Sequence, residues 1–136
     1  MRKDIEIPKV KDVSVAVVKE LNDEKTVEVY NVYIINQKNA QLESVLVSSK
    51  GYGENKSTGE KIKTSVLRHF IGNVEAKSFA KIEPIVEQVF GISNEYWVSF
   101  SLDGKMYDKK YVFLAETIID DNMITIPIIE QKGVMI

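Results

Sequence analysis

Apolar and polar side chains alternate in short stretches along the chain. Val13, Val15 and Val17 alternate with polar or small residues, which places the three valines on one face of a strand that ends near Leu21. Residues 26–37 are apolar on both faces in their second half, as is typical of a central strand. Clusters of turn-forming residues separate such stretches, so the pattern predicts strands rather than helices.

The same pattern predicts further strands over residues 42–49, 63–72 and 76–82. Pro84 and Gly91 bracket a segment with the start and stop signals of one short helix near residues 84–90. The sequence "MITIPII" predicts a last strand that closes the fold, and "EQKGVMI" after it is expected to be a tail.

Asp103 and Gly104 give the strongest local signal, because an Asp-Gly pair between two strand-like runs favours a tight β-hairpin. With these two residues as the loop, the expected partners are Leu102 and Lys105, Phe100 and Tyr107, Tyr96 and Tyr111, Trp97 and Lys110, and Ser99 and Asp108. One face of the hairpin then carries the aromatic side chains that fill a core. The other face carries Trp97 and is expected to be solvated or to contact a partner.

These elements predict an all-β protein, an immunoglobulin-like β-sandwich of about seven antiparallel strands in a single domain over residues 1–136. The immunoglobulin-like assignment depends on strand number alone. Since two stacked sheets use nearly all the apolar side chains, we expect no pocket in which polar groups converge.

Composition narrows the function classes. The chain has 136 residues, of which 44% are hydrophobic, and no cysteine, which excludes disulfides, thiolate nucleophiles and iron–sulfur clusters. No signal-peptide core or apolar run of membrane-spanning length occurs, so we expect a cytoplasmic protein without membrane contact. The net charge of −2 argues against a dedicated nucleic-acid binder.

The sequence "SSKGYGENKSTGEK", residues 48–61, resembles a phosphate-binding loop in its glycine and lysine content. A Walker loop needs four residues between its glycines and a lysine after the second. Here five residues separate Gly53 from Gly59, and Glu60 follows. We therefore expect a mobile connection between strands. The basic residues in and near it remain candidates for contact with an anion or RNA: Lys50, Lys56, Lys61, Lys63 and Arg68.

His69 is the only histidine, so one chain cannot build a metal site from several histidines. Its position in an apolar strand favours a structural role, although it could act as a general base beside a carboxylate. Asp120 to Asn122 form the densest acidic group but lack the spacing of an EF-hand. We expect neither a metal nor a cofactor.

Trp97 is the best candidate for an interface residue, with Lys110 opposite it, because exposed tryptophans are enriched at contact surfaces.

The order of "IEIPKVKDVSVAVVKE", "VYIIN", "VLVSSKGYG", "TSVLRHFIG", "AKSFAKIE" and "DGKMYDKKYVF" resembles a family of small uncharacterised bacterial proteins over nearly the whole chain. Some members carry the label phenylalanyl-tRNA synthetase alpha subunit. The resemblance implies a link to translation but supplies no catalytic residues, since Arg2 and Arg68 are the only arginines available for an ATP site.

Three functions stay open. The first is a non-enzymatic β-sandwich module that acts through protein–protein contacts with an unknown partner, or as a homo-oligomer. The second is a translation-linked RNA-binding accessory that uses the five basic residues given above. The third is a small hydrolase that uses His69 and an unidentified carboxylate.

Overall fold

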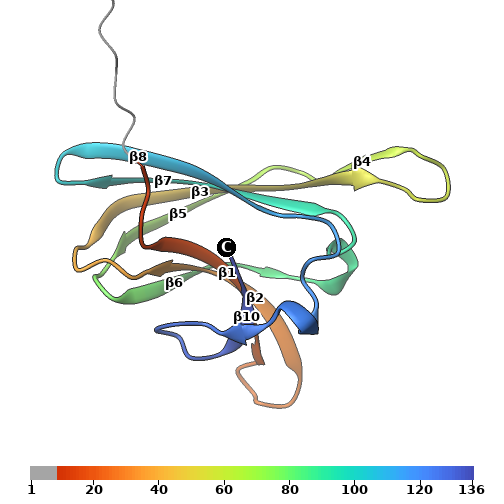
Figure 1. Ribbon diagram of the computed structural model, residues 1–136, viewed down its shortest axis with the longest axis horizontal. Helices are drawn as coiled ribbons and strands as arrows, with labels where there is room; N and C mark the ends of the chain where they lie inside the picture. Colours follow the sequence, from red (N-terminus) through yellow and green to blue (C-terminus); the bar gives the residue numbers. More distant parts are fainter. Residues whose placement is uncertain (1–8) are drawn as a thin grey trace, which may run out of the picture.

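The computed structural model describes residues 9–136 and shows a β-sandwich of two antiparallel sheets (Figure 1). Sheet A contains, in order, β6 (Ser78–Ile85), β2 (Glu28–Asn36), β1 (Val13–Leu21), β10 (Lys132–Met135) and β9 (Ile124–Thr125). Sheet B contains, in order, β4 (Lys61–Lys63), β3 (Leu42–Glu54), β7 (Ser93–Leu102) and β8 (Lys105–Phe113), and β5 (Leu67–Val74) pairs with β3. The prediction of an all-β sandwich is thus confirmed. The described residues form ten strands rather than about seven, and the immunoglobulin-like arrangement stays a prediction.

The core lies between the two sheets. Val15, Val17 and Ile34 of sheet A are fully buried there, as are Phe100 and Phe113 of sheet B. Burial of an aliphatic or aromatic side chain of this size contributes about 1.5–3 kcal/mol to the stability of the fold. The side chains that the predicted alternation directs inward therefore stabilise the packing of the two sheets. The role of the hairpin aromatics in filling the core is confirmed.

The hairpin of β7 and β8 has the predicted register, including the pairs of Phe100 with Tyr107 and of Trp97 with Lys110. The backbone explains why the turn could be predicted. Asp103 and Gly104 both have positive φ, at 51° and 74°, which Asp tolerates and Gly adopts without strain.

A second apolar layer covers the outer face of sheet A. Ala16, Val18 and Ile35 are fully buried on that face, beneath Ile126, which is also fully buried, and the partly buried Ile128. This layer explains why residues 26–37 are apolar on both faces. No equivalent layer covers the outer face of sheet B among the described residues.

The prediction of a C-terminal tail is wrong. Strand β9 is only Ile124–Thr125, whereas β10 pairs with β1 and buries Val134 in the core. Gly133 makes this pairing possible, since a Cβ atom there would lie 2.4 Å from the carbonyl oxygen of Val17. Glycine usually weakens a strand, so the four residues Lys132–Met135 did not indicate a strand that approaches β1 this closely.

The predicted loop over residues 48–61 is largely a hairpin. Strand β3 continues through Gly51 and Gly53 to Glu54 and pairs with β4, and the pair projects from the sandwich (Figure 1). The two glycines allow Ile92 to pack against the strand, because a Cβ atom at either position would lie within 3.0 Å of the Ile92 side chain. These two glycines thus serve packing within a hairpin, where the sequence predicted a connection without regular structure.

The short helix expected near residues 84–90 is a 3-10 helix over Glu87–Val89 only. Pro84 does not begin it. Instead, β6 continues through Pro84 to Ile85, and Pro84 pairs with Asn31. Strand β6 lies at the edge of sheet A, where a proline is tolerated because one side of the strand needs no hydrogen-bond donors.

Candidate functional site

Trp97 lies on the outer face of sheet B, as the alternation along β7 predicts. Its side chain is 43% exposed, whereas its neighbours Tyr96 and Val98 point into the core. The ammonium group of Lys110 lies 5.4 Å from the centre of the Trp97 ring, which is within the range of a cation–π interaction. The two interface candidates are therefore in contact.

Arg68 lies on the same face as Trp97. Ser48 of β3 pairs with Arg68 on one side and with Trp97 on the other, so the three form one row across the sheet. A shallow groove of about 210 Å³ runs along this row, lined in addition by Leu46, Val47, His69 and Ser99. Sequence analysis named Trp97 and Arg68 for different roles, and the structure brings them to one groove.

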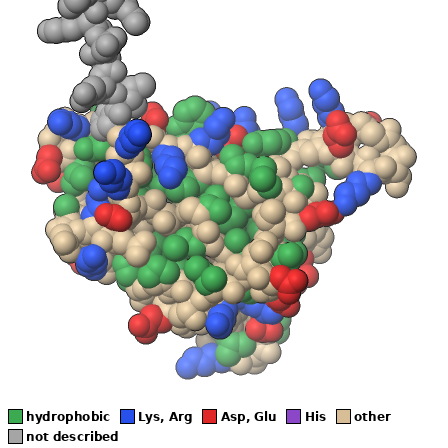
Figure 2. Space-filling view, viewed as in Figure 1, with side chains coloured by type: hydrophobic (Ala, Val, Ile, Leu, Met, Phe, Trp, Pro, Cys, Tyr) green, Lys and Arg blue, Asp and Glu red, His purple; other side chains and the backbone are tan. Residues whose placement is uncertain are grey.

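Exposed apolar side chains extend the groove. Leu46 is 51% exposed and pairs with Phe70, which is 71% exposed, and Met106 of β8 is 66% exposed. In Figure 2, hydrophobic and basic side chains lie side by side along the upper edge of the molecule, where Figure 1 shows sheet B. We call this surface, made of Leu46, Arg68, Phe70, Trp97 and Lys110, the sheet B face.

The remaining basic candidates do not line the groove of the sheet B face. Lys50 lies 3.8 Å from the carboxylate of Glu95 and near the ring of Tyr52. Lys56 pairs with Glu116. Two of the predicted RNA contacts are thus engaged with carboxylates within the chain. Lys61 and Lys63 are exposed on β4, in the projecting hairpin.

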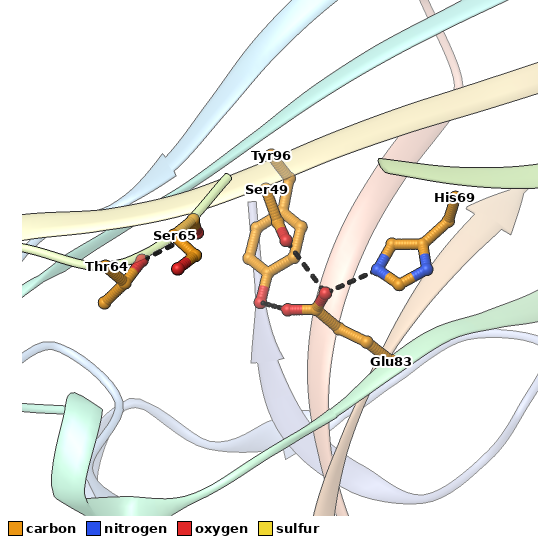
Figure 3. A network of polar contacts seen from close by, with 6 residues as sticks. All are labelled: Ser49, Thr64, Ser65, His69, Glu83 and Tyr96. Carbon is orange, nitrogen blue, oxygen red and sulfur yellow. Dashed lines mark hydrogen bonds and ion pairs between the residues drawn. The ribbon is translucent and has the colours of Figure 1, made fainter. Parts of the chain in front are cut away.

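A second polar cluster lies between the sheets, around Glu83 of β6 (Figure 3). The Oε1 atom of Glu83 lies 2.7 Å from Nε2 of His69 and accepts a hydrogen bond of 2.8 Å from the Ser49 hydroxyl. Its Oε2 atom accepts a hydrogen bond of 3.0 Å from the Tyr96 hydroxyl. One carboxylate of sheet A thereby binds three strands of sheet B. The expectation that no polar groups would converge is wrong.

A β-bulge directs Glu83 inward. Val32 pairs with Glu83 and Tyr33 with Lys81, so Ile82 is an extra residue in β6. Ile82 is buried in the core, and because of the extra residue the next side chain, Glu83, also faces the core. Strict alternation would place Glu83 on the opposite face. This is why sequence analysis missed it.

A cavity of about 310 Å³ lies next to Glu83, on the side of Ser49 and Tyr96. Its walls also include the apolar residues Pro84, Val86 and Leu67. Burial, followed by the negative charge of Glu83, raises the pKa of Tyr96, so its hydroxyl stays protonated and donates to the carboxylate.

The cluster is a poor match for nucleophilic catalysis. In a serine hydrolase the hydroxyl bonds to the imidazole, but here Ser49 and His69 both bond to the same oxygen of Glu83. Among residues 9–136, no three His, Asp or Glu side chains are grouped so that they could hold a metal ion.

One sequence signal could have revealed Glu83. The apolar residues Ile82 and Ile85, both buried in the structure, are three positions apart in the sequence, which breaks the two-residue period of a strand and indicates an extra residue between them. Ser49 and Tyr96 carried no such signal, since both follow the regular alternation of their strands.

No protein-family model matches the chain, and neither curated proteins nor solved structures gave a match. The resemblance described above therefore stays a prediction. No helix in the described part of the chain is long and apolar enough to cross a membrane.

Proposed function

We propose that this protein is a non-enzymatic β-sandwich module that binds a partner protein through the sheet B face. The observation that carries the proposal is that Trp97 and Arg68, on either side of Ser48, line one groove on the broad sheet face that no other described segment covers. Tryptophan and arginine dominate binding energy in protein interfaces, because both offer large contact areas and directed polar groups.

The chemistry of the face indicates the partner. Within residues 9–136, Arg68 forms no ion pair, and the Lys110 ammonium lies over Trp97 at the other end of the same row. Two cations thus flank an apolar groove. A partner segment that presents an aspartate or glutamate beside a leucine or phenylalanine would match this surface. The apolar side chain would fill the groove, and the carboxylate can bond to the Arg68 guanidinium through two hydrogen bonds.

Fluorescence tests this proposal directly, since Trp97 is the only tryptophan of the chain. Peptides of about eight residues that pair Asp or Glu with Leu or Phe should shift its emission, and versions with Lys in place of the acid should not. Arg68→Glu should weaken binding at least tenfold, as expected for loss and reversal of a charge-assisted contact. Lys132→Glu, a matched change at an exposed position in sheet A, should leave binding unchanged.

Two results would contradict the proposal. The first is emission that no acidic, apolar peptide changes at millimolar concentration. The second is a dimer, seen by light scattering, that Trp97→Ala dissociates. The second result would assign the sheet B face to a second copy of the chain.

The translation-linked RNA-binding alternative has less support in the geometry, because Lys50 and Lys56 interact with Glu95 and Glu116. It predicts salt-sensitive binding of transfer RNA, and lack of binding at low ionic strength would count against it. Location in the cytoplasm also stays a prediction.

A further inference from the structure

The cavity beside Glu83 lies where the edges of the two sheets separate. Strands β5 and β6 are consecutive in the chain but belong to different sheets. At their common turn, the Asn36 side chain donates hydrogen bonds to the carbonyl oxygens of Val74 and Glu75 and holds the edges together. Further along, the contact of His69 with Glu83 spans the edges. The cavity begins beyond that contact.

Among residues 9–136, Glu83 supplies the only charged group directed at this cavity. The one other charged residue in its wall is Lys50, and the Lys50 ammonium lies 3.8 Å from Glu95. Glu95 precedes Tyr96 in β7, so its side chain lies on the outer face of sheet B, away from the cavity. The cavity therefore has negative polarity at one end.

The two oxygens of Glu83 differ in their remaining capacity. Oε1 is occupied by two contacts, with Ser49 and His69, whereas Oε2 accepts one hydrogen bond, from Tyr96. A carboxylate oxygen can accept two hydrogen bonds, so Oε2 retains one position. A ligand group that fills it must be a donor, and a positively charged donor binds a carboxylate most strongly.

The rest of the wall is largely apolar and also carries the hydroxyl groups of Ser49, Thr64 and Ser65, so it is compatible with a ligand that is mostly apolar. Pro84, Ile85, Val86 and Val89 form one side. Asn94, also in the wall, donates from its amide nitrogen to the carbonyl oxygens of Val89 and Ile92, which leaves its side-chain oxygen as an acceptor. The volume of about 310 Å³ is at the lower end of the range for small-molecule sites.

We propose that this cavity binds a small primary amine, whose ammonium group donates to Oε2 of Glu83 and whose aliphatic chain packs along Pro84 and Val86. The site is separate from the sheet B face, because Tyr96 and Trp97 are neighbours in β7 and point to opposite sides of the sheet.

Nuclear magnetic resonance can test the site at a single residue. His69 is the only histidine, so its imidazole protons give one set of signals, and its ring contacts the proposed anchor. Titration with n-pentylamine at constant pH should shift these signals saturably. The emission of Trp97 should stay constant, because that side chain lies on the other face of the sheet. Pentan-1-ol and pentanoate, which match the chain but lack the positive charge, should bind at least tenfold more weakly.

Two variants separate the site from general charge effects. Glu83→Gln should weaken pentylamine binding at least tenfold, whereas Glu43→Gln, which removes the same charge from an exposed position of β3, should leave it unchanged. Val86→Trp places a large ring at the partly open wall and should block binding while Glu83 and its three contacts are kept. Circular dichroism establishes that each variant is folded.

Three outcomes would overturn the proposal. They are His69 signals that do not change with pentylamine, equal affinity for the amine and the alcohol, and unchanged affinity in folded Val86→Trp. None of them bears on the sheet B face, whose peptide binding is measured through Trp97.

Discussion

The hydrogen bond between Tyr96 and Glu83 should make a measurable contribution to folding, because it joins the two sheets inside the sandwich. Tyr96 is 1% exposed and its hydroxyl lies 3.0 Å from Oε2 of Glu83. A hydrogen bond to a charged group contributes about 1.5–3 kcal/mol. Tyr96→Phe removes this bond with little change in shape, so the free energy of unfolding should fall by about that amount.

A double-mutant cycle isolates the bond from its surroundings. Glu83→Gln puts a donor or a weaker acceptor opposite Tyr96 and should itself cost about 1.5–3 kcal/mol. Since both changes remove the same interaction, the double variant should lose about 0.5–3 kcal/mol less than the sum of the single variants. Urea unfolding followed by circular dichroism measures all three. As a control, Tyr107→Phe, whose hydroxyl has no hydrogen bond within residues 9–136, should change stability by about 0.5 kcal/mol at most.

Additive losses would refute the reasoning. If the double variant lost the sum of the single losses to within about 0.5 kcal/mol, the hydroxyl and the carboxylate would contribute independently, and the three donors would not form one bonded cluster around Glu83.

Two further predictions concern the backbone and the response to alkali. Gly133→Ala places a methyl group 2.4 Å from the Val17 carbonyl oxygen and should lower the unfolding free energy by about 1–3 kcal/mol, whereas Gly91→Ala, with open space around the new atom, should have little effect in the same urea assay. Burial raises the pKa of Tyr96 and of Tyr111 above the ordinary value of 10.0. The contribution of the two protonated hydroxyls to the free energy of unfolding is therefore complete below pH 10 and is lost as the pH rises further. Between about pH 10 and 11 the free energy of unfolding, measured with urea, should fall by about 1 kcal/mol for each group, because the unfolded tyrosine is only partly ionised in this interval. Tyr111→Phe should remove its share, and an unchanged pH dependence in that variant would contradict the assignment.

The sequence predicted most where local chemistry determines structure. The Asp103–Gly104 turn sets the register of β7 and β8, and the alternation of side chains along β7 puts Tyr96 inside and Trp97 outside. Strands were equally predictable where valines alternate over five residues, as from Val13 to Val17.

The sequence predicted least where a distant partner determines structure. Gly133 became part of a strand because the backbone of Val17 lies against it, a contact between residues at opposite ends of the chain. Likewise, the cluster around Glu83 depends on strands from both sheets. Periodicity describes which face a side chain occupies, but it does not state which strand lies opposite.

The extra residue in β6 makes the polarity of the cavity depend on a single codon. Deletion of Glu83 would restore strict alternation, with Ile82 opposite Val32 and facing the core, and would remove the carboxylate from the cavity, while the strand order could remain the same. A related chain one residue shorter at this position would keep the sandwich and have a cavity without a carboxylate. Insertions and deletions within edge strands can thus alter what such a fold accommodates without any substitution at the wall itself.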